Sequence, residues 1–194
     1  MAVVDWMSPI VKTLSALTLA WLLMPASPIL GDVPFPDVDE SVIDPEIRAL
    51  VVERIAKTSG ETQDLNRTNE IDQTIVAKGR NAVATLIAMA QKAANTDPLV
   101  LGKSQDFGNE LRCPVDMLVK IGDRRAIPLL SALMKFDTKP RRMFTSLARL
   151  LCYGTDKQIE LDAKSQDPNL ARVAQTILRY PDQYKYYRDL YRKK

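Results

Sequence analysis

Arginines are the residues of this 194-residue chain whose type and spacing best suit binding chemistry. Four of them form two adjacent pairs, Arg124 with Arg125 and Arg141 with Arg142. A guanidinium group presents a planar fork of donors that binds carboxylate or phosphate groups in bidentate fashion. We therefore treat these four as candidate interaction residues. The competing interpretation is that they solvate a helix face or cap helix ends.

The C-terminal segment 184–194 combines tyrosines with basic residues. Its candidate interaction residues are Tyr184, Tyr187, Arg188 and Tyr191. Aromatic rings beside positive charge suit a protein interface or an anionic membrane surface. The alternative is a polar end cap that covers the last helices of the chain. Nucleic acid, which also binds aromatic and basic groups, is not an expected partner of an exported protein.

The composition excludes several kinds of chemistry. The chain contains no histidine, which removes histidine-based acid–base catalysis, Ser-His and Cys-His nucleophile pairs, and histidine metal sites. Its two cysteines are too few for a four-thiolate zinc site. We predict no enzyme activity, no catalytic residue, no metal and no cofactor. A histidine-free enzyme that uses Glu160 and Asp162 is the least favoured alternative.

The cysteines are expected to be reduced and buried. Cys113 should begin one helix, whereas Cys152 should end the equivalent helix of the next unit. A separation of eight or so residues at a rise of ~1.5 Å each would place them at different levels. A disulfide needs Cα atoms within about 7 Å of each other. We therefore predict two free thiols.

Residues 1–30 have the pattern of a signal peptide. Lys12 precedes a run without charge, residues 13–24, whose length fits the apolar core of roughly 7–15 residues in a signal peptide. A membrane span needs about 20 residues. Small residues at Ala26 and Gly31 offer cleavage positions. We predict a secreted or periplasmic protein, with an uncleaved, membrane-anchoring segment as the alternative.

The rest of the chain is predicted to be a linker followed by helices. Residues 31–44 are rich in proline and acidic residues and are expected to be an extended linker. The domain 45–194 should be all-α, since glycine is scarce and apolar residues recur at helical spacing. Asp-Pro pairs mark helix starts at residues 44–45 and 167–168. The polar segment 61–72 is expected to be a loop.

Three glycines mark corners between helices: Gly79, Gly122 and Gly154. The central corner spans residues 120–128, where Gly122 ends one helix and Asp123 caps the next. We expect it to be the tight turn within a helical hairpin. A hairpin with one apolar face cannot bury that face alone, so several hairpins must pack together.

The segment 118–133 resembles a HEAT-like repeat of the phycobilisome-lyase type. In such repeats an apolar helix ends in Gly-Asp, and a small residue and a proline open the next helix. The Asp167-Pro168 entry is similar. The resemblance implies a short α-α superhelix, a HEAT/armadillo-like solenoid of antiparallel helix pairs. It also implies a protein-binding scaffold.

We therefore predict an exported, non-enzymatic module that mediates protein–protein interaction. Its partner should be another protein, with an anionic membrane surface as a further candidate for the C-terminal segment. The alternative function is a surface subunit or assembly factor of a membrane protein complex. In that case an uncleaved segment 1–30 would hold the protein at the membrane.

Overall fold

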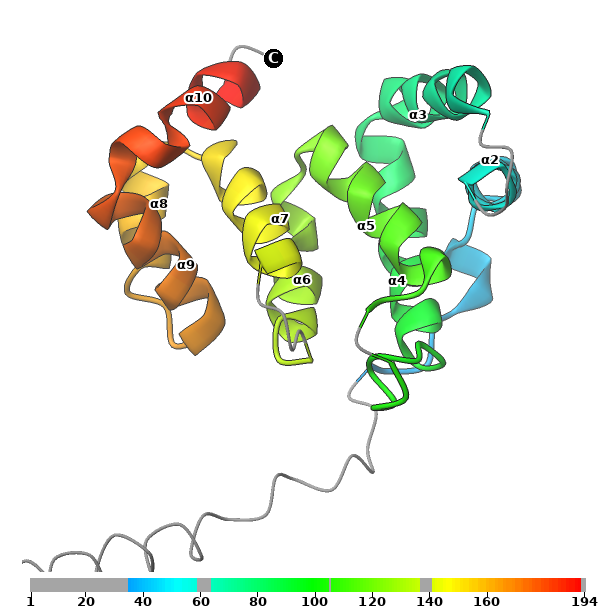
Figure 1. Cartoon of the computed structure of the whole chain (residues 1–194), viewed down its shortest axis with the longest axis horizontal. Coiled ribbons are helices and arrows are strands. Elements are labelled where there is room, and N and C mark those ends of the chain that lie inside the picture. The colour runs from blue at the N-terminus through cyan, green and yellow to red at the C-terminus, as the bar shows by residue number, and fades with distance from the viewer. Residues whose placement is uncertain (1–34, 59–63, 105, 137–140, 193–194) are drawn as a thin grey trace, which may run out of the picture. The chain divides into compact units, whose positions relative to one another are not determined.

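The computed structural model describes residues 35–58, 64–104, 106–136 and 141–192 (Figure 1). The chain divides into two units, 1–32 and 33–194, and every described residue belongs to the second. The predicted signal peptide or anchor, residues 1–30, lies outside the described residues. Among the helices that are described, none combines the length and apolar character that a membrane span requires.

The prediction of an all-α fold is confirmed for the described residues, which contain helices and no strand. Figure 1 shows the elements in their order along the chain. They are η1 (Glu40–Val42), α2 (Pro45–Thr58), α3 (Leu65–Lys78), α4 (Arg80–Ala94), α5 (Asn109–Ile121), η2 (Arg124–Ala126), α6 (Ile127–Leu133), α7 (Arg141–Cys152), α8 (Asp156–Asp162), α9 (Pro168–Arg179) and α10 (Pro181–Arg192).

Short polar side chains start these helices, as the sequence predicted. The Asp44 carboxylate accepts a hydrogen bond from the backbone N–H of Glu46 at 2.8 Å. The Asp167 carboxylate accepts one from the N–H of Asn169 at 2.9 Å, and Pro168 opens α9. These contacts satisfy donors that the first helical turn leaves without intrahelical partners.

Helix α3 begins earlier than predicted. We expected a loop over residues 61–72, but α3 starts at Leu65. The Asp64 carboxylate accepts a hydrogen bond from the N–H of Arg67 at 3.0 Å and caps the helix. The prediction failed because the first turn is polar and the apolar stripe starts only at Ile71, so periodicity gave no signal there.

The helices pair as α2 with α3, α4 with α5, α6 with α7, and α8 with α9. The glycine corners therefore lie between successive pairs, which corrects the expectation that Gly122 turns within a hairpin. Helix α5 packs mainly on α4, while α6 packs on α7. Helix α6 does not fold back on α5, because the three-residue helix η2 lies between the corner and the start of α6.

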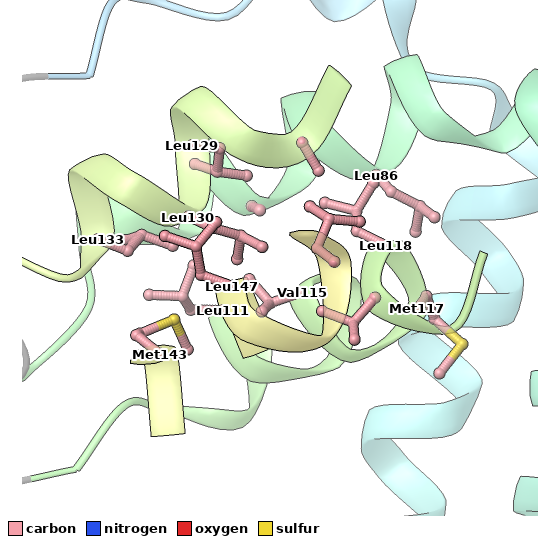
Figure 2. Packing of buried hydrophobic residues seen from close by; sticks show 14 of the residues in the cluster. Leu86, Leu111, Val115, Met117, Leu118, Leu129, Leu130, Leu133, Met143 and Leu147 are labelled. Atoms are coloured by element: carbon pink, nitrogen blue, oxygen red, sulfur yellow. The ribbon is translucent and has the colours of Figure 1, made fainter. Parts of the chain in front are cut away.

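One apolar core runs through all of these pairs. Figure 2 shows its centre, where Leu86 of α4 and Leu118 of α5 lie near Leu130 of α6 and Leu147 of α7. These four side chains are fully buried. The second helices contact one another in order, α3 with α5, α5 with α7, and α7 with α9. Each pair therefore buries its apolar face against its neighbours.

Part of the expected linker packs on this domain. Phe35 and Ile43 are both buried, and the Phe35 ring centroid lies 6.4 Å from that of Phe136. The Glu40 carboxylate forms an ion pair with Lys92 of α4. Residues 35–44 are therefore not a solvated spacer, because Phe35 and Ile43 are buried and Glu40 is paired with Lys92.

The corners at Gly122 and Gly154 each place a side chain against the glycine of the other. Gly122 has a φ of +76°, and a Cβ there would overlap the Tyr153 ring. The Tyr153 hydroxyl donates to the backbone carbonyl of Lys120 at 3.2 Å. Gly154 has the Arg124 guanidinium in the same position. The corners therefore fix successive pairs against each other.

We predict that Gly122→Ala destabilises the domain through two separable effects. The left-handed backbone should cost about 1–2 kcal/mol with a Cβ, and the overlap with Tyr153 a further ~1–3 kcal/mol. Urea unfolding measures the sum. In a Tyr153→Ala background, Gly122→Ala should cost only the backbone part. An equal cost in both backgrounds would show that the ring contact is irrelevant.

Candidate functional site

The candidate site is a groove made of two adjoining cavities, which we call the arginine groove. The first cavity has a volume of about 440 Å³ and the second about 550 Å³, and Thr145 lines both. The first is lined by Arg112 and Asp116 of α5 and by Arg142, Met143, Thr145, Ser146 and Arg149 of α7. The second is lined by Phe144 of α7, Arg172 and Thr176 of α9, and Gln183, Tyr184 and Tyr187 of α10.

Helical periodicity places the polar side chains of α7 on the groove. Met143 and Leu147 on one face of α7 are buried in the core. Arg142, Ser146 and Arg149 follow one another at spacings of four and three residues, which puts them on a common face away from the core. The burial of the apolar stripe thus decides which way the arginines point.

Positive charge dominates the groove. Arg112, Arg142, Arg149 and Arg172 come from three helices, and Asp116 is the acidic residue among the lining side chains. Burial raises the pKa of Asp116, although neighbouring cations, Arg54 first among them, oppose that shift. The groove is therefore suited to an anionic group.

Arg149 is held by a ring and lacks one hydrogen bond. Its guanidinium carbon lies 5.1 Å from the centroid of the Tyr187 ring, a cation–π contact. Its Nε atom is buried and has no hydrogen-bond partner among the described residues. A buried donor without an acceptor costs about 1–3 kcal/mol.

The C-terminal candidates pack against the domain and also line the groove. Tyr184 is buried, which raises its pKa, and Tyr187 is half-buried. Arg188 forms an ion pair with Asp156 at the start of α8. Helix α10 packs on α7 and α9, and its Tyr184 and Tyr187 line the second cavity. The side chain of Tyr191 lies outside the described part of the structure.

The other arginine candidates are divided between two places. Arg142 lines the groove, and the side chain of Arg141 is not among those described. Arg124 and Arg125 instead line a cavity of about 790 Å³ at the glycine corners. No local sequence pattern indicates that Arg112 and Arg172 lie near Arg142, because the three arginines belong to different helices.

The corner cavity is larger than either part of the groove, but its arginines are already bonded. Arg124 pairs with Asp162 and donates to the backbone carbonyl of Leu151 at 3.2 Å. Arg125 donates to Asp123 at 2.8 and 3.0 Å and to the carbonyl of Arg80 at 3.0 Å. The hydrogen bonds from Arg125 lower the pKa of Asp123. These arginines therefore serve the corners.

The carboxylate pair considered for catalysis does not converge. Asp162 is buried and accepts from Arg124 and from the Gln158 side chain, while Glu160 is exposed. Residues two apart on a helix point in different directions. The described residues also contain no group of three or more acidic or cysteine side chains arranged to hold a metal ion.

An ionic cluster that the sequence did not reveal joins α2, α3 and α5. The carboxylate of Asp72 in α3 is buried and accepts a hydrogen bond from Arg54 Nε of α2 at 2.5 Å. Lys120 of α5 pairs with the same carboxylate. Its members lie 18 and 48 residues from Asp72 in the sequence, so no local pattern indicates the cluster.

We predict that Asp72→Asn destabilises the protein by about 3–5 kcal/mol, because Arg54 and Lys120 would lose the charge that compensates them. Glu53→Gln is the matched control. Glu53 pairs with Arg67 at 2.7 Å, but both side chains are more than a third exposed. Such a pair contributes about 0–1 kcal/mol. Denaturant unfolding compares the variants, and similar losses would contradict the buried role of Asp72.

Both cysteines are buried and neither forms a disulfide, as predicted. Burial raises the pKa of Cys113 to about 11, although the nearby Arg54 guanidinium opposes the shift. Since thiolate is the reactive form, Cys113 should be inert at neutral pH.

We predict no modification of Cys113 by iodoacetamide at pH 7 in the folded protein and complete modification in denaturant. Rapid labelling of the native protein, read by mass spectrometry, would contradict this environment.

Comparison with known proteins identifies no relative of this chain. No family model, curated protein or solved structure matches the chain. Its function is therefore inferred from its residues and their geometry.

Proposed function

We propose that this chain is a non-enzymatic, HEAT-like repeat module that binds another protein through the arginine groove. The succession of helix pairs supports the repeat assignment, since each pair packs on the next and all share one core. The Gly122-Asp123 corner lies between two pairs, and the proline that follows it, Pro128, is in the first turn of α6. In this proposal the all-α fold is a short solenoid.

The observation that carries the binding proposal is the composition of the groove. Arginines from α5, α7 and α9, the second helices of three successive pairs, line two cavities that share Thr145. Repeat proteins bind partners along extended surfaces to which neighbouring repeats contribute. Arginine and tyrosine are also the residue types that contribute most to protein interfaces.

Export is part of the proposal and rests on the sequence of residues 1–30 alone. The interaction site itself is independent of that segment, since all groove residues lie between Arg112 and Tyr187.

Affinity capture from the native host with the full chain tests the function. The groove variant is Arg142→Glu with Arg172→Glu, two exposed side chains in the two cavities. The control is Lys103→Glu with Arg179→Glu, which changes the net charge equally at exposed positions outside the groove. We expect a partner captured by the wild type to be retained by the control and lost with the groove variant. Retention by both variants would refute a role for the groove.

A further inference from the structure

We infer that the arginine groove binds an acidic peptide segment in which an apolar or aromatic side chain lies beside a run of carboxylates. This inference rests on the proposed function, because it names the chemistry of the partner segment at the same site. It follows from the different linings of the two adjoining cavities.

The first cavity fits carboxylates. Arg112, Arg142 and Arg149 bring planar donor forks to one space of about 440 Å³, and Ser146 adds a hydroxyl. Arg142 lies 3.6 Å from Asp106, an exposed pair that a ligand can replace at little cost. Arg149 also lines this cavity, and its guanidinium is positioned by the Tyr187 ring.

The second cavity fits an apolar side chain with an acidic neighbour. Phe144, Tyr184 and Tyr187 provide ring surfaces, and Arg172 adds positive charge. Aromatic rings bury large apolar side chains and keep a polar edge available. Because Thr145 lines both cavities, the two features of a ligand must be close together in its chain.

Two acidic residues near the start of the described chain have partners outside the groove. Glu40 is paired with Lys92, and Asp39 accepts a hydrogen bond from the N–H of Ser41. Phe35 is buried against Phe136. This segment therefore does not occupy the groove, and the expected ligand belongs to another chain.

A protein segment fits the groove better than a nucleic acid. A phosphate backbone requires an unbroken track of cations. Here the carboxylate of Asp116 lies in the first cavity, and Asp106 pairs with Arg142 at its edge. A peptide can place its carboxylates away from Asp116 and Asp106. A nucleic acid carries a phosphate at every nucleotide, so some of its phosphates would be repelled by these two carboxylates.

The test measures binding of blocked synthetic peptides to the full chain by fluorescence anisotropy. The probe peptide contains the sequence Glu-Glu-Glu-Leu-Phe. One comparison peptide has Gln for each Glu, and another has Ser-Ser for Leu-Phe. We expect each comparison peptide to bind about tenfold more weakly or worse, since charge-assisted hydrogen bonds and apolar burial are removed separately. Affinity for the probe should also fall as salt is raised from low to physiological concentration.

Variants locate the binding within the groove. Arg142→Glu and Arg172→Glu should each weaken the probe peptide by about tenfold or more. Arg149→Lys should weaken it as well, because lysine keeps the charge but loses the fork and the Nε donor. The double control Lys103→Glu with Arg179→Glu should bind like the wild type. Thermal unfolding of every variant establishes that the fold persists.

Three results would overturn the inference. These are equal affinity for the Gln peptide, equal weakening by the control variant, or tighter binding of a single-stranded DNA oligonucleotide than of the probe. The failure of the inference is distinguishable from that of the proposed function. If the wild type binds no acidic peptide while its captured partner still depends on Arg142 and Arg172, the ligand chemistry is wrong and the groove remains an interface.

Discussion

The structure depends on the burial of apolar helix faces between neighbouring pairs. Leu118 of α5 and Leu147 of α7 are fully buried because helices on both sides cover them. At ~25 cal/mol per Å² of apolar area, one isolated pair would bury too little to offset the entropy lost on ordering its chain. The helix pairs are therefore stable only when packed together, and the faces that do not pack on a neighbouring pair form the surface of the domain.

Polar contacts add precision to this packing. The Tyr153 ring against Gly122 and the Arg124 guanidinium against Gly154 connect consecutive corners. Asp72 of α3 connects three helices through Arg54 of α2 and Lys120 of α5. These interactions fix the relative positions of the pairs, which apolar burial alone would leave loosely specified.

The arginine groove is a consequence of the same arrangement. The apolar stripe of each second helix is buried in the core. The arginines of α5, α7 and α9 lie outside that stripe and line the two cavities of the groove. Helix α10 completes the depression with two tyrosines, and Arg149 is positioned by its contact with Tyr187. The site therefore needs several pairs and the C-terminal helix together.

The sequence by itself determined the helices and most of their ends. Apolar spacing predicted the helical class, Asp-Pro pairs predicted the starts of α2 and α9, and Gly79 and Gly122 predicted two corners. These features depend on neighbours a few residues apart, which is why they can be predicted. The start of α3 was missed because its cap, Asp64, precedes a polar turn.

Only the tertiary structure decided how the helices pair and which side chains meet. It placed Gly122 between pairs, bound Arg124 and Arg125 within the corners, and brought Arg112 and Arg172 beside Arg142. These outcomes depend on contacts between residues tens of positions apart. Periodicity along one helix fixes which face is buried, but the neighbour that covers it is set by the packing of the whole domain.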